Sequence, residues 1–358
     1  MQRLWPLVEQ DEDLLGTVEA IVEAGLVTWF PGEGRVAVSP DAHVGIIATM
    51  TPSEADFAHR WAARWSDGVT SLLHRAAAVH GSDDHLAFQL EFEARQFGAQ
   101  GRCRKAAELL RRAADISAGT ALAAQRESLS AEFALRAHDL HQARRSLSAV
   151  REGVAPAFHR ALAGRLAVLE NRIDEGASLL QGACRELRQA GETDGRSFSA
   201  AVQWSAHAQW LAGDPVRKVG QQLKELDSLS IRDPYWASER QRLEAILTSS
   251  AEGPAQGLRV LADHSTAVHS ASAEVRGRSA VTEAWLRLEA GDADRCEAAA
   301  RSALAVASSE ETGHIVEAAM TIRGHALWLR GAWEEAKVCG TFAAASSSPL
   351  RRSRGETL

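Results

Sequence analysis

Small and apolar side chains recur at helical spacing along most of the chain, most clearly over residues 319–343. Ala319 and Ala326 lie on one face of a predicted helix, and Gly331 supplies the left-handed conformation that ends a helix without a Cβ clash. A second helix follows with a row of small residues at i, i+4 and i+7, against which a neighbouring helix can approach closely. That row is Ala336, Gly340 and Ala343.

Six further copies of this helix-turn-helix pattern precede that stretch from residue 86 onward. A helix pair cannot bury its small-residue row alone, so the pairs must stack on one another. The spacing between turns varies from about 33 to 42 residues, longer than the usual tetratricopeptide unit. We therefore predict an all-α, tetratricopeptide-like α-solenoid of about seven helix pairs. The turns of the six upstream copies fall at Gly101, His138, Asn171, Gly213, Gly253 and Gly291.

The first 68 residues have a different pattern. An amphipathic helix is predicted over residues 13–24, and two short strands, 26–30 and 36–38, flank a turn at residues 31–34. Helices are then predicted over residues 42–50 and 52–65, the latter with Thr51 as N-cap and Glu54 completing a capping box. This order predicts a winged-helix module with a two-stranded hairpin. The predicted domains are residues 1–68 (winged-helix-like link), 69–348 (helical repeats) and 349–358 (a polar basic tail).

Composition favours one helical chain without an extreme charge. The 358 residues are 45% hydrophobic and carry a net charge of -7, which argues against a chain that holds DNA or an acidic membrane through its overall field. No apolar run of about 18 residues spans a membrane, and the first 15 residues carry acids where a signal peptide needs an apolar run. The four cysteines are scattered, so we interpret them as helix-packing residues of a cytoplasmic protein.

Several N-terminal segments together resemble a known family. They are Glu23-Ala24-Gly25-Leu26-Val27, Ser39-Pro40, Thr51-Pro52 and His59-Arg60-Trp61-Ala62. With the repeats that follow, they look like the winged-helix link and sensor region of large ATP-binding LuxR-type transcriptional regulators of actinobacteria. In that family an ATPase precedes the link, and a DNA-binding helix-turn-helix follows the repeats. The resemblance implies a sensor region that biases an ATP-dependent switch.

This chain departs from the family pattern at several points. Ser39 stands where the family usually has His, and Asp56 where it usually has Arg. The chain contains no phosphate-binding loop, so no cofactor is expected in it, and ATP is expected only if the family's ATPase module exists. The predicted recognition segment, residues 42–50, has no Arg or Lys, so we expect DNA contact only through a missing C-terminal helix-turn-helix. The chain is expected to be a fragment of such a regulator or a relative lacking both ends.

Candidate binding residues follow from the geometry of stacked helix pairs. The residue after each packing residue of a first helix points to the concave face, and so does the residue three further on. Such a row of Arg, His and Trp can hold a peptide, a partner helix or a small effector. The alternative is that the tryptophans are core and the charges a solvated face, and Trp333 in particular is predicted to pack. The row comprises Arg95, Glu132, Arg165, His207, Trp210, Trp285, His325 and Trp328.

The sequence contains no motif for catalysis or metal binding. His138 and His141 stand three apart, and His80 and His85 flank Asp83-Asp84, but neither set has the ligand count and spacing of a closed metal site. Nucleophile-elbow and metalloprotease motifs are absent, so we predict a non-enzyme. The predicted function is the sensor or protein-interaction region of a LuxR-type regulator, which binds a protein partner or small effector. The alternatives are a free-standing scaffold or adaptor and, less favoured, an α-helical enzyme.

Overall fold

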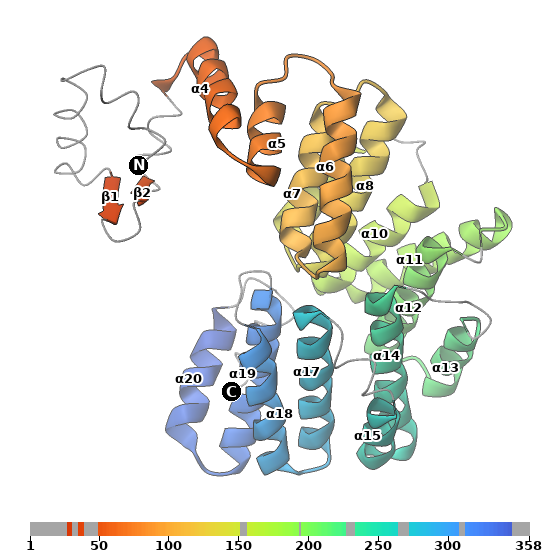
Figure 1. Cartoon of the computed structure of the whole chain (residues 1–358). Coiled ribbons are helices and arrows are strands. Elements are labelled where there is room, and N and C mark those ends of the chain that lie inside the picture. The colour runs from red at the N-terminus through yellow and green to blue at the C-terminus, as the bar shows by residue number, and fades with distance from the viewer. Residues whose placement is uncertain are drawn as a thin grey trace. The chain divides into compact units, whose positions relative to one another are not determined.

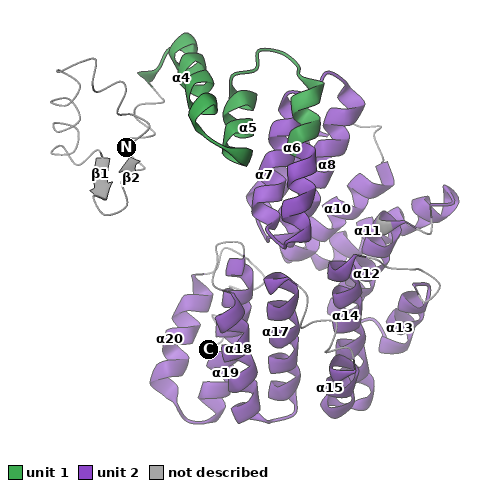
Figure 2. Ribbon diagram, in the orientation of Figure 1, with its two compact units in different colours: residues 1–90 green, residues 91–358 purple. Residues whose placement is uncertain are grey.

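The chain divides into two units, as Figure 2 shows: Met1–Leu90 and Glu91–Leu358. The computed structural model describes residues 27–30, 35–38, 49–150, 156–192, 195–226, 233–263, 272–307 and 312–345. The division falls inside helix α6 (Asp84–Ala99), whereas the sequence places a boundary after residue 68. That boundary stays a prediction, and the predicted tail, residues 349–358, lies outside the described residues.

Unit 1 contains a β-hairpin at the position predicted from the sequence. Strands β1 (Val27–Phe30) and β2 (Arg35–Val38) pair antiparallel, with Val27 opposite Val38 and Phe30 opposite Arg35. A winged helix also needs the helices predicted over residues 13–24 and 42–50. Apart from residues 49 and 50, these lie outside the described residues, so the winged-helix module stays a prediction.

Helices α4 (Pro52–Trp65) and α5 (Gly68–Ala77) follow the hairpin and pack against each other. The Glu54 amide donates to Thr51 Oγ1 at 3.4 Å, and the Thr51 amide donates to Glu54 Oε2 at 2.7 Å, which confirms the predicted capping box. Between the helices, His59 Nδ1 and His74 Nδ1 lie 3.1 Å apart. Burial and the neighbouring His59 lower the pKa of His74.

From α6 onward the described residues form seven helix pairs, and Figure 1 labels most of their helices. This agrees with the predicted helical repeat architecture. The pairs are α6 with α7 (Cys103–Asp115), α8 (Thr120–Arg136) with α9 (Leu140–Ala149), α10 (Pro156–Leu169) with α11 (Ile173–Gln189), α12 (Arg196–Leu211) with α13 (Val216–Lys224), α14 (Pro234–Glu252) with α15 (Pro254–Ala262), α17 (Ala273–Glu289) with α18 (Ala293–Val306), and α19 (Gly313–Leu329) with α20 (Trp333–Ala344).

The turn inside each pair has one residue with positive φ, and all seven are the predicted turn residues. At the last turn the Gly331 amide donates to the Trp328 carbonyl at 3.0 Å, and the next amide donates to the Leu327 carbonyl at 2.9 Å. This pattern satisfies the carbonyls that a helix leaves open at its end. His138 and Asn171 adopt the same conformation without being glycine, with φ of 56° and 65°.

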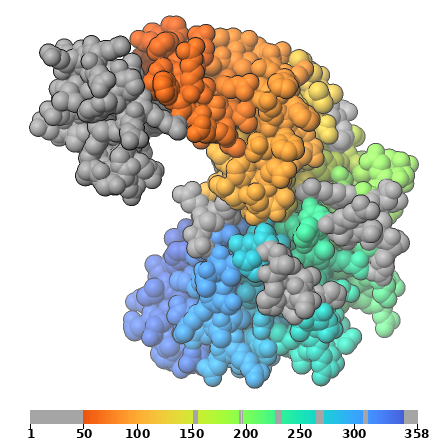
Figure 3. All heavy atoms as spheres, viewed as in Figure 1, coloured from red at the N-terminus to blue at the C-terminus, as the bar shows by residue number. Residues whose placement is uncertain are grey.

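Within unit 2 the first helices of successive pairs stack in the order α8, α10, α12, α14, α17 and α19. Small residues fill the contacts, as predicted: Ala284, Cys296 and Ala300 are buried in one cluster, and all four cysteines are buried. Figure 3 shows side chains filling the space between the C-terminal helices, drawn in blue. None of the described helices is long and apolar enough to cross a membrane.

Candidate functional site

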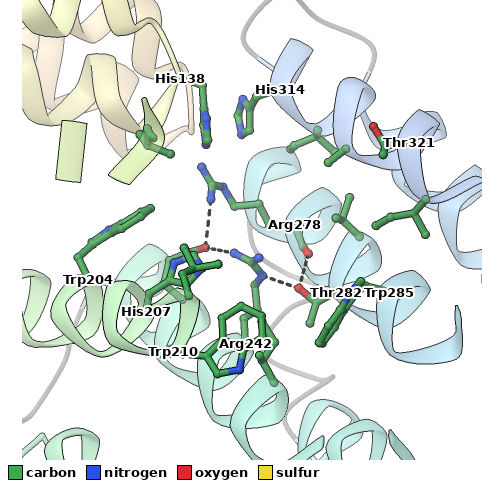
Figure 4. A pocket seen from close by; sticks show the side chains of 18 residues that line it. His138, Trp204, His207, Trp210, Arg242, Arg278, Thr282, Trp285, His314 and Thr321 are labelled. Atoms are coloured by element: carbon green, nitrogen blue, oxygen red, sulfur yellow. Dashed lines mark hydrogen bonds and ion pairs between the residues drawn. The ribbon is translucent and has the colours of Figure 1, made fainter. Parts of the chain in front are cut away.

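A pocket of about 240 Å³ lies in unit 2 between α12, α14, α17 and α19, the first helices of the last four pairs. The turn after α8 and the end of α10 complete its wall, and Figure 4 shows the side chains turned toward the cavity. Seven apolar residues form part of the lining. The aromatic and polar lining residues are His138, Trp204, His207, Trp210, Glu239, Arg242, Arg278, Thr282, Trp285, His314 and Thr321.

One side of the pocket is an aromatic wall made of Trp204, His207, Trp210 and Trp285. The first three are spaced by three residues in α12, so they project on the same side of that helix. The ring centroids of Trp204 and His207 lie 5.2 Å apart, and those of His207 and Trp210 lie 6.0 Å apart. Trp285 from α17 meets Trp210 edge-on at 6.0 Å. Trp204 is buried and the other three rings are half-buried, so they offer faces to a ligand.

Beside this wall lies an ion-pair group made of Glu239, Arg242 and Arg278. Glu239 Oε1 accepts from Arg242 Nη1 at 2.6 Å and from Arg278 Nη1 at 3.4 Å. Arg242 Nε also donates to Thr282 Oγ1 at 2.6 Å. Burial opposes ionisation of Glu239, but the guanidinium groups of Arg242 and Arg278 outweigh it and lower the pKa of that carboxyl to about 2. The group therefore keeps its charges throughout the physiological pH range.

Two histidines close the end of the pocket nearest α8. His138, in the turn after α8, stacks on His314 at the start of α19, with ring centroids 4.5 Å apart and planes 16° apart. Figure 4 shows the two rings face to face above Arg278. Residues 176 positions apart in the sequence thus meet at this pocket.

Behind the pocket lies a tyrosine cluster, built around Tyr235, the chain's single tyrosine. Arg165 Nη2 donates to the Tyr235 hydroxyl at 3.0 Å, and the Arg136 guanidinium carbon lies 3.9 Å from the centre of the ring. Arg136 also pairs with Glu274 at 3.2 Å, and Arg278 Nη2 donates to the Arg136 carbonyl at 3.1 Å. The five side chains are buried.

The tyrosine cluster joins α8, in the second pair, to α17, in the sixth. In a simple stack each repeat contacts only its neighbours, which leaves one face open. Here the approach of α8 to α17 closes part of the face that the sequence predicts to be concave. The pocket is the space that remains between the cluster and the aromatic wall.

Four of the predicted binding residues lie at or near this pocket, and a fifth, Glu132, is buried in α8. His207, Trp210 and Trp285 line it. Arg165 stands behind the aromatic wall, with its guanidinium carbon 4.6 Å from the centre of the Trp204 ring, and Glu132 is buried with 2% of its surface exposed. Arg165 and Glu132 thus belong to the packed interior and not to an open groove.

The other three predicted residues lie elsewhere. Arg95 is exposed and pairs with Glu91 at 2.6 Å, while His325 Nδ1 lies 2.9 Å from the Thr321 carbonyl. Trp328 is 50% exposed and meets Trp333 edge-on at 6.2 Å. Trp333 is itself 62% exposed, so the prediction that it packs is wrong. It lies on α20, the last described helix, against which no further described helix packs.

Sequence reasoning missed the charged half of the site. Glu239, Arg242 and Arg278 were not singled out because charged residues on a helix usually face solvent. Trp204 could have been found, since it precedes His207 by three residues and so shares its helix face. The sequence marks His138 as a turn residue and as a weak metal-ligand candidate, and it gives no sign that this ring faces a pocket. Within the described residues no group of three or more His, Cys, Asp or Glu is placed to hold a metal ion.

The arrangement is suited to binding. The carboxylate of Glu239 is a weak base, because its pKa is low and both arginines hold its charge. Burial raises the pKa of the Cys184 and Cys296 thiols to about 11 and about 12, which disfavours the nucleophilic thiolate. What the pocket does offer is aromatic faces beside a guanidinium, a combination that binds ligands by stacking and ion pairing.

No protein-family model and no curated protein matches the chain. Among solved structures, it is similar to a tetratricopeptide repeat protein from Parabacteroides merdae, with 12% identity over 75% of this chain and 97% of that one and a TM-score of 0.47. It is also similar to the tetratricopeptide repeat domain of P58(IPK), with 14% identity over 87% of this chain and 94% of that one and a TM-score of 0.26. The helix-pair architecture described above rests on the helices and turns themselves.

Proposed function

We propose that unit 2 is a non-catalytic recognition domain, which binds a small effector or one side chain of a protein partner in the pocket. The observation that carries this proposal is the aromatic wall, whose half-buried tryptophans face a cavity beside Arg242. Such a convergence of apolar faces and a few polar groups is typical of ligand sites. Tryptophan and arginine are also the residues that contribute most at protein interfaces.

The resemblance to large LuxR-type regulators gives this binding a biological role. In that setting, effector binding to the repeats would bias a switch that controls DNA binding, because a ligand that prefers one conformation shifts the population toward it. The chain would act in the cytoplasm without touching DNA itself. The alternative is a free-standing scaffold that holds a protein partner and has no connection to transcription. The reading frame on either side of these residues separates the two, since an ATPase and a helix-turn-helix sequence belong only to the first.

The binding proposal is tested by thermal unfolding of the purified chain with a panel of small aromatic compounds and short peptides. A ligand that binds only the folded chain raises the melting temperature. We expect at least one member of the panel to stabilise the wild type and Trp333→Ala but not Trp285→Ala. Trp333→Ala is the matched control because that ring is exposed and does not line the pocket. Ligands that stabilise both variants equally, or a panel without any stabilising member, would contradict the proposal.

A further inference from the structure

We infer that the pocket is built for a small aromatic acid, with the ring against Trp210 and Trp285 and the carboxylate on Arg242. This inference rests on the proposed binding function and names the chemical class of the ligand. Three observations support it: the charges that line the pocket, the free donor of Arg242, and the size of the cavity.

The charges that line the pocket sum to a positive value. Arg242 and Arg278 are both in the lining, and Glu239 is the one carboxylate among the described lining residues. Arg165, behind the wall, adds a further cation close enough to favour the ionised form of Glu239. An anion entering this space is attracted, whereas a cation is repelled by two guanidinium groups in a partly desolvated site. The aromatic wall therefore serves a ligand that is negative or neutral and not a quaternary ammonium ion.

Arg242 has a donor left over for a ligand. Its Nε is used by Thr282 and its Nη1 by Glu239, while Nη2 makes no hydrogen bond among the described residues. Its side chain is 18% exposed, compared with 9% for Arg278, which is held by Glu239, by Glu274 and by the Arg136 carbonyl. Thr282 and Glu239 fix the guanidinium plane, so the free Nη2 is held in place before a ligand arrives.

The cavity limits the size of the ligand. Its volume of about 240 Å³ is smaller than the roughly 300–1,000 Å³ of pockets that take drug-sized molecules. Trp210 and Trp285 meet edge-on, so the two rings are not stacked on each other, and both line the cavity that would receive a planar guest. One aromatic ring with a short acidic arm fits this space and reaches from these rings to Arg242, which Figure 4 shows beside Trp210 and Thr282.

The inference is tested by calorimetric titration of the full chain with cinnamate, cinnamamide and cinnamylamine. The three compounds share one skeleton and differ in charge. We expect cinnamate to bind about tenfold or more tightly than cinnamamide, because a charge-assisted hydrogen bond replaces a neutral one. Cinnamylamine is expected to bind most weakly.

Variants at Arg242 connect that preference to the proposed contact. Arg242→Gln should weaken cinnamate binding about tenfold and leave cinnamamide within about twofold. Arg242→Lys keeps the charge but not the planar guanidinium, so it should retain only part of the preference. Arg295→Gln, on an arginine whose side chain is 71% exposed, is the control and should change neither affinity. If circular dichroism shows that Arg242→Gln does not fold, Thr282→Val replaces it. That variant removes the hydroxyl that orients Arg242. It should weaken the binding of cinnamate more than the binding of cinnamamide.

The outcomes separate this inference from the proposed function. If cinnamate and cinnamamide bind equally well and Trp285→Ala abolishes both, the proposed recognition pocket stands but the preference for an acid is wrong. Tighter binding of cinnamylamine would lead to the same conclusion. If a peptide ending in phenylalanine binds but cinnamate does not, the ligand is the C-terminus of a protein partner and not a small aromatic acid. That result would also overturn the inference. If none of these ligands binds and the thermal panel is also negative, both proposals fall.

Discussion

The seam between α10 and α11 and the tyrosine cluster behind the pocket are both buried, but they are built in opposite ways. In the seam, a Cβ added to Gly176 would lie 2.5 Å from Val168 Cγ2 and 2.8 Å from the Gly164 carbonyl, so the helices touch through backbone. In the cluster, the charged Arg165 meets the polar Tyr235 across 70 residues of sequence. The seam uses small residues from one repeat, and the cluster uses long polar residues from several.

The difference teaches where this fold is stabilised and where it is specialised. Close packing of small apolar residues stabilises each helix pair without removing any charged group from water. Buried ion pairs are weak stabilisers, because removing two charges from water costs about as much as their attraction returns. The cluster therefore indicates a requirement other than stability, and its position suggests what that is: it holds α8 near α17 and so forms the rear wall of the pocket.

The largest effect is expected from Glu274→Gln in the tyrosine cluster. This change removes the charge that pairs with the buried Arg136 guanidinium and leaves Arg278 with Glu239 alone, so it should lower the free energy of unfolding by about 3–5 kcal/mol in urea titrations. Glu283→Gln is the control on the same helix, where a partly exposed pair with Arg287 should be worth about 1 kcal/mol or less. A loss below about 1 kcal/mol in Glu274→Gln would show that the cluster charges are not buried as described.

A smaller effect is expected from Gly176→Ala in the seam. The added methyl group must displace Val168 or the Gly164 backbone, which should cost about 1–3 kcal/mol. Gly220→Ala is the matched control, because that helical glycine has open space around its Cβ position and should gain about 0.5–1 kcal/mol. Equal stabilisation by both changes would show that the seam is not a close backbone contact.

The smallest effect is a pH dependence at His74, in unit 1. The lowered pKa of His74 means that the folded state binds a proton less readily than the unfolded chain, whose histidine pKa is near 6.5. Above about pH 6.5 the histidine is neutral in both states and does not affect the free energy of unfolding. As the pH falls through that value, the unfolded chain takes up the proton more readily, so the folded state loses stability. The pKa of about 2 at Glu239 predicts that this pocket carboxylate stays ionised over the same pH range.

Hydrogen exchange measured between pH 7.5 and 5.5, with intrinsic rates corrected for pH, checks this contrast. Protection of residues 52–77 should decline, and protection of α14 and α17 should stay constant. In His74→Gln the decline should be reduced. A decline that is equal in both regions would contradict the assignment of the titrating group.

The parts of the fold that could be predicted are those fixed by residues close in sequence. Glycine or Asn supplies positive φ, Thr51 caps its helix, and rows of small residues mark a seam, so the turn positions followed directly from the chain. The tyrosine cluster could not be predicted, because Arg136 and Glu274 look like surface residues of two separate helices. Their meeting depends on how small rotations accumulate over several helix pairs.

The candidate site shows the same limit. His207, Trp210 and Trp285 were selected by a rule that assigns one inward row to every pair, and they do line the pocket. The same rule also selected Arg95 and Trp328, which do not line the pocket. Because the spacing between turns varies from pair to pair, a residue at a constant offset from the turn does not face inward in every repeat. Which charged residues face the aromatic wall is a property of the assembled unit.

The claim at the centre of this account is that the aromatic wall receives a ligand. Fluorine NMR of fluorotryptophan-labelled protein, with resonances assigned by single Trp→Phe variants, tests it directly during titration with cinnamate. We predict that the resonances of Trp204, Trp210 and Trp285 shift together, while those of the exposed Trp328 and Trp333 do not move. Shifts confined to Trp328 and Trp333 would contradict the account.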